Sequence, residues 1–226
     1  MKLPSNYRET LVCVNRRGAT AEIWSNQKQT EAYKIYYGNF PYEEQKFNAF
    51  LSLNNPNCFS PKDLVFIEGE DLEKGYSMNF DDGKSLRLVQ DESLDKLISA
   101  ADLIAPTIED ITSHHFSIVD ANIENITFSD AFKFVDVYAF AWLKQYRESL
   151  LYRQSINRMN VSICCGIIDI NYRKILELYF RKINYKGLDY FLKQRTGSKD
   201  YVKTVLTLVQ EATNTDSLRE VKQLIK

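Results

Sequence analysis

The sequence predicts an α+β chain in which a β-rich part precedes a mostly helical part. Short segments with alternating or β-branched apolar residues fill residues 10–37 and 63–80, whereas from residue 91 the apolar residues recur at helical spacing. The 226 residues, 44% of them hydrophobic, suffice for one compact unit or two lobes. Strands separated from helices favour an α+β fold over a doubly wound sheet. We expect a β-rich N-terminal lobe over 1–82 and a helical C-terminal lobe over 83–226, joined near NFDDGK.

Five strands are predicted in the N-terminal part. The first three are TLVCV, AEIW and EAYKIYY, and the third places Tyr33 and Ile35 on one face and Lys34 on the other. Two further strands are DLVFIEGE and GYSMNF, at 63–70 and 75–80, and the turn DDG closes them.

One helix is predicted between these strands, over YEEQKFNAFLSL at 42–53. Pro41 is suited to its first turn, and Glu43 and Glu44 are favourable near the positive end of the helix dipole. The apolar face of this helix includes Phe47.

The C-terminal part is predicted to be helical with one interruption. The stretch 92–115 has apolar residues at helical spacing, and Pro106 marks a kink or break. The short strand-like pieces NITF and FKFVDV then flank the turn SDA. From about residue 139 we expect helices over LKQYRESLLYRQSI, INYRKILELYFRKI and KDYVKTVLTLVQEA, and a short tail helix.

Charge and cysteine content exclude several classes of function. The formal net charge is −1, so the basic excess of a nucleic-acid-binding protein is missing. The four cysteines form no Cys-x-x-Cys pair and the two histidines are adjacent, which is not a zinc ligand set. The first residues, MKLPSNYRET, lack the apolar stretch of a signal peptide, and the apolar run VSICCGIIDI is too short to span a bilayer. We therefore expect a cytoplasmic protein with reduced cysteines and no membrane span.

Three polar residues interrupt apolar segments in the stretch IVDANIENITFSDAFKFVDVY. Asp120 is followed five residues later by Asn125 and eleven residues after that by Asp136, each near β-branched or aromatic neighbours. A surface loop mixes polar groups with other polar groups. Polar side chains among apolar ones indicate instead that rigid strands aim them into a cleft.

The order of these residues resembles that of the protein kinase superfamily. Its catalytic loop has an Asp, four intervening residues and then a metal-binding Asn, and a second Asp follows a short hairpin. The chain has DANIENI at 120–126, similar to Asp-Leu-Lys-Pro-Glu-Asn-Ile, and FVDVY at 134–138, similar to the strand into Asp-Phe-Gly. Upstream, RGATAEIW is similar to the end of a glycine-rich loop, and AYKI at 32–35 to Val-Ala-Ile-Lys. The resemblance covers about residues 10–140 and implies a bilobal protein-kinase-like fold with a small β-rich N-lobe and a mostly helical C-lobe.

The resemblance also implies an ATP site with Mg²⁺. Lys34 would neutralise the α- and β-phosphates and be steered by Glu44, for which Glu43 is the alternative. Asp120 would orient the acceptor hydroxyl and accept its proton. The implied metal ligands are Asn125 and Asp136, and the implied nucleotide contacts besides Lys34 are Gly18, Met78 and Phe80. Taken singly, each residue also has a purely structural interpretation, such as an Asx turn or a solvated strand lysine.

The chain departs from the family in four places. Ile118 and Val119 stand where the family has His and Arg, which removes the docking group for a phosphorylated activation segment. Asp136 is followed by Val and Tyr in place of Phe and Gly, the glycine-rich loop keeps only Gly18, and no Ala-Pro-Glu follows. These departures leave the substrate class more open than nucleotide binding.

The predicted function is an ATP- and Mg²⁺-dependent phosphotransferase that acts on a protein Ser/Thr hydroxyl. Two alternatives share the fold: a small-molecule hydroxyl kinase similar to aminoglycoside and choline kinases, and a pseudokinase that serves as a binding module. An unrelated structural α+β protein is the remaining alternative. The sequence names neither the acceptor nor the oligomeric state.

Overall fold

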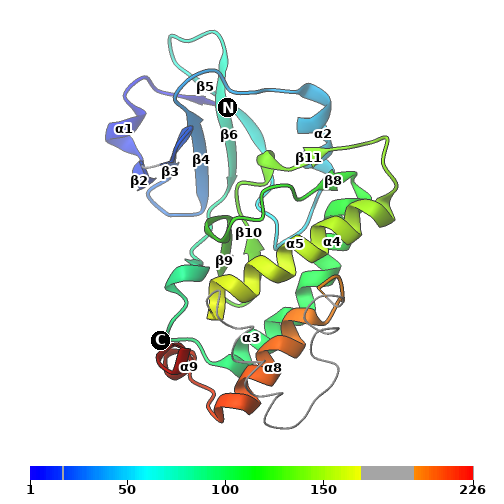
Figure 1. Cartoon of the computed structure of the whole chain (residues 1–226). Helices are drawn as coiled ribbons and strands as arrows, with labels where there is room; N and C mark the ends of the chain where they lie inside the picture. The colour runs from blue at the N-terminus through cyan, green and yellow to red at the C-terminus, as the bar shows by residue number, and fades with distance from the viewer. Residues whose placement is uncertain (17, 169–195, 226) are drawn as a thin grey trace. The chain divides into compact units, whose positions relative to one another are not determined.

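The computed structural model describes residues 1–16, 18–168 and 196–225. The chain divides into two compact units, Met1–Asp82 and Gly83–Lys226 (Figure 1). Strands dominate the first unit and helices the second, so the predicted α+β class is confirmed. The helix predicted over INYRKILELYFRKI lies outside the described residues.

A six-stranded sheet of order β1-β5-β6-β4-β3-β2 forms the N-terminal unit. All its pairs are antiparallel except β1 with β5. The five predicted strands are confirmed, whereas β1 and the short helix α1 were not predicted because neither is long enough to show a period. The elements are β1 (Lys2–Leu3), α1 (Tyr7–Thr10), β2 (Val12–Asn15), β3 (Ala21–Ser25), β4 (Glu31–Tyr36), β5 (Asp63–Ile67) and β6 (Glu73–Asn79).

The two faces of this sheet have different contents. On one face, α1 and the sheet share an apolar cluster to which Tyr7, Trp24, Tyr33 and Ile35 belong. Since side chains alternate along a strand, Lys34 lies on the opposite face. This confirms the alternation predicted for EAYKIYY.

The helix α2 (Glu44–Ser52) starts later than predicted. Pro41 lies before it in a segment without regular secondary structure, where the Tyr42 amide donates to the Phe40 carbonyl at 2.8 Å, and not in its first turn. The neighbouring Phe40 is buried, and its ring centroid lies 5.1 Å from that of Tyr36 and 5.8 Å from that of Tyr76. These aromatic contacts, together with the extended conformation that Pro41 favours in the residue before it, keep this segment out of the helix.

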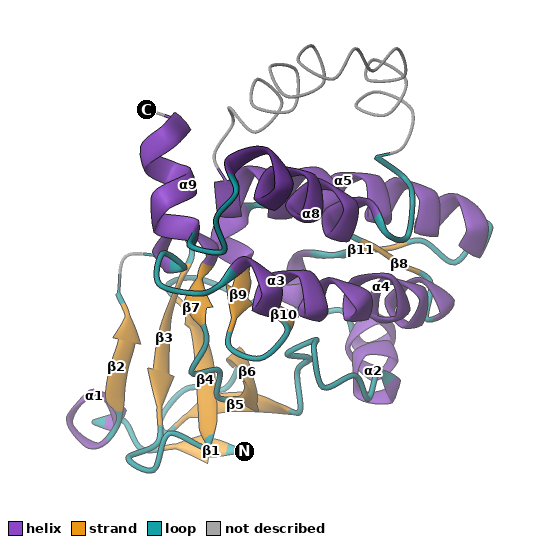
Figure 2. Cartoon of the chain, turned by 90° about the horizontal axis from the view of Figure 1, so that it is seen from below, coloured by secondary structure: helices purple, strands orange, loops and turns teal. Residues whose placement is uncertain are grey.

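A bundle of helices makes up most of the C-terminal unit (Figure 2). The predicted break near Pro106 is a 3₁₀ turn, Ala101–Leu103, and Pro106 itself lies in the first turn of the following helix, where proline is tolerated. In the described ranges, every helix is too short or too polar to cross a bilayer. The helices are α3 (Leu94–Ala100), α4 (Ile104–Ser113), α5 (Glu148–Ile168), α8 (Tyr201–Thr213) and α9 (Leu218–Ile225).

Short strands complete this unit. The order of the three-stranded sheet is β10-β9-β7, and β8 pairs with β11. The two predicted strands around the turn SDA are confirmed, but the helix predicted from residue 143 begins at Glu148. β11 ends directly before that residue, and the Leu143 amide donates to the His115 carbonyl at 2.9 Å, so the pairing with the strand that contains Phe116 continues into the predicted start of the helix. The strands are β7 (Lys84–Ser85), β8 (Phe116–Ser117), β9 (Ile126–Phe128), β10 (Phe132–Phe134) and β11 (Ala141–Trp142).

Candidate active site

The hairpin β9–β10 is the framework of the site in the C-terminal unit. Phe128 pairs with Phe132 across it, and both rings are buried with centroids 5.1 Å apart. At its turn the Ser129 hydroxyl donates to Asp130 at 2.7 Å. This hydrogen bond, with further ones from the Asp130 amide and Lys133, lowers the pKa of Asp130 to about 2.

The open end of this hairpin brings the three predicted oxygen donors together. The Val135 amide donates to the Asn125 carbonyl at 3.0 Å, which continues the ladder one step beyond β9 and β10. Asp136 follows Val135 directly, so it lies at the same end of the hairpin as Asn125. The Asn125 side-chain amide in turn donates to the Asp120 carboxylate at 3.4 Å. Sequence positions sixteen residues apart thus meet in one place.

Asp136 has a left-handed backbone, with φ 57° and ψ 34°. For most residues with a side chain this conformation costs roughly 1–2 kcal/mol, and Asp and Asn tolerate it best. The chain then enters a 3₁₀ turn, Val137–Ala139, in which the Ala139 amide donates to the Asp136 carbonyl at 3.1 Å. Conformations of this kind are concentrated at functional sites. Here it redirects the backbone directly after β10 and Val135, into the 3₁₀ turn.

The loop that carries Asp120 is held at its start by α5. The Ile118 amide donates to the Ser155 hydroxyl at 3.1 Å, and the Arg158 guanidinium donates to the Ile118 carbonyl at 3.0 Å. Sequence analysis missed both α5 residues. The only sequence feature that links them is their spacing of three residues, which puts both on one face of a helix.

The end of the same loop is held by the segment around β7. The Asn122 side chain caps a 3₁₀ turn, Ile123–Asn125, by accepting from the Glu124 amide at 3.1 Å. The Glu124 carboxylate pairs with Arg87 at 2.8 Å and accepts from the Ser85 hydroxyl at 3.3 Å. Asn125 follows directly, so these contacts also limit its position.

Lys34 lies near the centre of the N-terminal sheet. Its neighbours across β3 and β6 are Ile23 and Tyr76, its side chain is buried, and its ammonium lies 5.4 Å from the centroid of the Tyr36 ring. Gly75 permits the close approach of the two strands, since a Cβ there would lie 1.8 Å from the Lys34 carbonyl oxygen. A buried lysine is rare unless its charge is compensated or used.

The other predicted nucleotide contacts are distributed over the N-terminal unit. Gly18 needs to be glycine because a Cβ would lie 2.2 Å from the Ala21 carbonyl oxygen. Met78 is buried and, as the cross-strand partner of Ala32, shares the face of Lys34. The Phe80 amide already donates to the Thr30 carbonyl at 3.3 Å. The carbonyl of Phe80 is therefore a better candidate than its amide for a hydrogen bond with the adenine of a nucleotide.

Glu44, the predicted partner of Lys34, is exposed at the first residue of α2. Its pairing with Lys34 stays a prediction, and so do the individual roles of Gly18, Met78 and Phe80.

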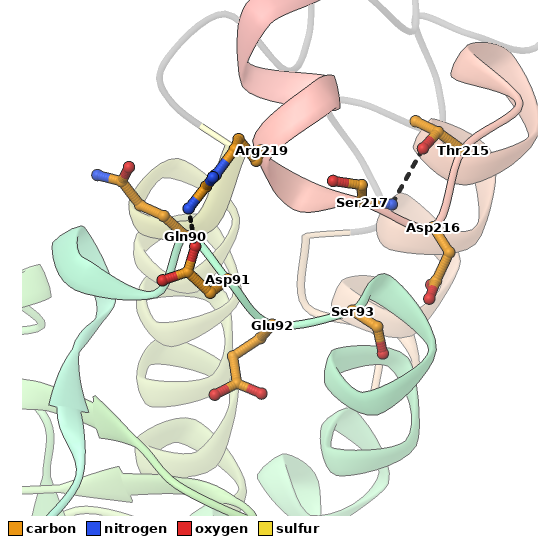
Figure 3. A pocket seen from close by; sticks show the side chains of 8 residues that line it. All are labelled: Gln90, Asp91, Glu92, Ser93, Thr215, Asp216, Ser217 and Arg219. Carbon is orange, nitrogen blue, oxygen red and sulfur yellow. Dashed lines mark hydrogen bonds and ion pairs between the residues drawn. The ribbon is translucent and has the colours of Figure 1, made fainter.

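A concave region apart from the hairpin is lined by residues before α3 and around the start of α9 (Figure 3). Its volume is about 590 Å³. Its polar groups are engaged with one another: Asp216 accepts from the Asp95 amide at 2.8 Å, and Arg219 pairs with Asp91. The groups that could bind a ligand therefore serve as helix caps and ion pairs. The lining residues are Gln90, Asp91, Glu92, Ser93, Thr215, Asp216, Ser217 and Arg219.

The oxygen donors fit a hard cation shared with a nucleotide. Among the described residues, no group of three or more His, Cys, Asp or Glu side chains forms a metal site by itself. Mg²⁺ is commonly bound through one or two protein oxygens together with substrate phosphates and water. Asn125 and Asp136 could supply such oxygens: the side-chain nitrogen of Asn125 faces Asp120, which leaves its side-chain oxygen for a metal ion.

Comparison with solved structures defines the fold as that of protein kinases. The autoinhibited serine kinase domain of the giant muscle protein titin is similar to the chain with a TM-score of 0.59 and 11% sequence identity, over 96% of this chain and 86% of the titin domain. Comparisons with protein-family models and with curated protein sequences find no match. At this identity the likeness establishes the fold, and the predicted kinase-like fold is confirmed.

Proposed function

We propose that the protein is a phosphotransferase that moves the γ-phosphoryl group of ATP to a hydroxyl group. The observation that carries the proposal is the meeting of Asp120, Asn125 and Asp136 at the open end of the β9–β10 hairpin. A protein-kinase-like fold without chemistry would not need three oxygen donors there. It would also not need a strained backbone at the third of them.

The residues divide the work as follows. The acceptor oxygen bonds to the γ-phosphorus while the bond from that phosphorus to the β–γ bridging oxygen breaks, and ADP leaves with the electron pair. Asp120 is exposed and accepts the proton that the hydroxyl loses. Lys34 neutralises charge on the α- and β-phosphates. Asn125 and Asp136 would hold Mg²⁺, which when bound neutralises phosphate charge and fixes the alignment of the phosphates.

A protein Ser/Thr hydroxyl is the first candidate acceptor, in keeping with the resemblance to protein kinases. A small-molecule hydroxyl is the second candidate, and one observation favours it. Between Asp136 and the start of α5 at Glu148 the chain makes a 3₁₀ turn and then strand β11, which pairs back onto β8. Residues 137–142 are therefore committed to local structure, and only the short exposed stretch 144–147 before α5 offers surface on which a peptide could dock. A cytoplasmic location, where ATP, Mg²⁺ and reduced cysteines occur together, fits either acceptor.

The test is Mg²⁺-dependent binding and turnover of ATP by the wild type and by Asp120→Asn. We expect ATP with Mg²⁺ to raise the melting temperature of both proteins, because Asp120 is not proposed to bind the nucleotide. Turnover should fall about 10³-fold in Asp120→Asn, within the usual range for loss of a general base. Phosphate release and ³²P transfer would be measured with casein or a peptide library, and with alcohols such as choline and aminoglycosides.

The outcomes separate the alternatives. Nucleotide stabilisation without turnover in any condition favours a pseudokinase that acts as a binding module. Stimulation by alcohols alone selects the small-molecule acceptor. Absence of any response to ATP and Mg²⁺ rejects the proposal.

A further inference from the structure

The Asp120 loop, defined as residues 118–125, is fixed at both ends and open in between. Ile118 at its start is 1% exposed, whereas Val119 is 47% exposed. Asp120 next to it is exposed as well. The loop therefore presents its middle to solvent and depends on its ends for its position. Different parts of the C-terminal unit hold those two ends.

The first anchor consists of hydrogen bonds to the backbone of Ile118. Ser155 and Arg158, one turn apart on α5, accept from its amide and donate to its carbonyl at 3.1 and 3.0 Å. Ser155 is fully buried, so the Ile118 amide would have no alternative partner from solvent. The side chains of Ile118 and Val119 cannot form hydrogen bonds. The direction of the backbone into Asp120 thus depends on α5, while the carboxylate of Asp120 also accepts from the Asn125 side-chain amide at 3.4 Å.

The second anchor holds Glu124, directly before Asn125. Its two carboxylate oxygens contact Arg87 at 2.8 Å and Ser85 at 3.3 Å. Both Arg87 and Glu124 are largely exposed, so this anchor is weaker than the first. Because Glu124 is the neighbour of Asn125 and not of Asp120, the second anchor acts on the position of Asn125.

We propose that these anchors are two separable positioning devices of one site. Ser155 and Arg158 set the position of Asp120 and hence the rate of phosphoryl transfer. Arg87 and Ser85, through Glu124, set the position of Asn125 and hence the affinity for the divalent cation. The inference rests on the proposed function. It differs from a general contribution to stability because each anchor affects one end of the loop and one kinetic quantity.

The position of the loop can be measured without any activity, by amide hydrogen exchange. Ser155→Ala should speed exchange of the Ile118 amide about tenfold or more, while amides later in α5, such as that of Ile163, keep wild-type protection. Ser149→Ala makes the same change at an exposed serine of α5 and is the matched control. Arg158→Met replaces an exposed side chain and serves as the second variant if Ser155→Ala does not fold. Exchange that rises throughout α5, or nowhere, overturns the first anchor.

The separation of the two anchors is tested by kinetics and cation binding together. Ser155→Ala should lower kcat about tenfold and leave the Mg²⁺ concentration for half-maximal rate within about twofold. Arg87→Met should raise that concentration about threefold and leave kcat at saturating Mg²⁺ within about twofold, as expected for a partly exposed ion pair. Arg153→Met, at an exposed arginine of α5, should change neither quantity.

Binding of Mn²⁺ with ATP, followed by electron paramagnetic resonance, gives the second anchor a measurement apart from activity. Arg87→Met should weaken it about threefold and Ser155→Ala should not. Equal shifts of kcat and of cation affinity in both variants overturn the proposal. If the wild type has no turnover, the proposed function fails, while exchange and Mn²⁺ binding still decide whether the anchors act separately. A wild type that binds no Mn²⁺ with ATP overturns the second anchor.

Discussion

The two units place their candidate groups by different physical means. Lys34 is positioned by regular strand alternation in a six-stranded sheet, between Ile23 and Tyr76 on the neighbouring strands. Asp120, Asn125 and Asp136 are positioned by short elements: a 3₁₀ turn, two three-residue strands and a left-handed residue. A regular sheet fixes a side chain through many equivalent contacts, whereas the irregular framework depends on a few specific hydrogen bonds. The two regions should therefore respond differently to substitution.

After the loss of turnover expected for Asp120→Asn, the largest expected effect is also on catalysis, when the ammonium group of Lys34 is removed from the sheet. Lys34→Met should lower kcat/KM for ATP about 100-fold, since loss of one preorganised electrostatic group typically costs 10²–10³ in rate. The melting temperature should change little, because methionine fills similar volume without a buried charge. Steady-state kinetics and thermal unfolding measure the two quantities. Lys28→Met, at an exposed turn, is the control. Retention of full turnover in Lys34→Met would remove Lys34 from the site.

The next largest effect is on the stability of the sheet itself. Gly75→Ala places a methyl group 1.8 Å from the Lys34 carbonyl oxygen, so β4 and β6 must separate. We expect unfolding free energy to fall by about 3 kcal/mol, the upper range for overpacking. Gly38→Ala is the matched control, because no atom lies within 4 Å of the added carbon. Chemical denaturation compares them. Equal stabilities for the two variants would show that the sheet is less tightly paired than the geometry indicates.

The difference between the units also determines what could be predicted from sequence. The five longer strands of the N-terminal unit follow from alternation, and that alternation separates Lys34 from the apolar cluster around Tyr33 and Ile35. In the C-terminal unit, periodicity detected the hairpin but missed the two-residue strands and started a helix at Leu143, five residues before α5 begins. Elements so short have no period, and tertiary pairing decides them.

The order of its residues predicts the candidate site but gives no indication of the contacts that support it. Asp120, Asn125 and Asp136 match the order of a known motif; in the structure the Asn125 side chain contacts Asp120, and the Asn125 carbonyl accepts from the residue before Asp136. Their roles stay predictions. Ser155, Arg158 and Arg87 act on the loop through its backbone or through Glu124. Contacts to backbone leave no pairwise signal in a single sequence, because any residue at position 118 offers the same amide and carbonyl.

A smaller effect tests the irregular framework at Asp136. Both Asp136→Ala and Asp136→Gly remove the carboxylate and with it the proposed metal ligand. Only alanine retains a Cβ in the left-handed conformation at φ 57°. Asp136→Gly should therefore be more stable than Asp136→Ala by about 1.5 kcal/mol, while neither binds Mg²⁺ with ATP. Thermal unfolding with and without Mg²⁺ and ATP measures both quantities. A glycine variant no more stable than the alanine variant would contradict the strained backbone.

The smallest effect concerns a buried charge that the N-terminal sheet uses for structure alone. Glu22 is almost fully buried and accepts hydrogen bonds from the Tyr7 hydroxyl at 2.7 Å and from the Arg8 guanidinium at 2.8 Å. Burial by itself raises the pKa of Glu22, but the hydrogen bonds from Tyr7 and Arg8 outweigh it, so the pKa is lowered. The pKa of Tyr7 is raised, first because its hydroxyl is buried and second because that hydroxyl donates to Glu22.

Glu22→Gln should therefore lower unfolding free energy by about 1 kcal/mol at pH 7, a value reduced because Arg8 is exposed. Folded Glu22 binds its proton less tightly than the unfolded chain, so its contribution is complete above the ordinary carboxyl pKa of 4.5 and declines as pH falls through the lowered folded value. Urea denaturation from pH 7 down to pH 3 should show the gap between wild type and variant closing with acid. ATP turnover at pH 7 should stay within about twofold, since Glu22 lies on the sheet face opposite Lys34. A gap that widens with acid would mean that the carboxylate destabilises the sheet instead.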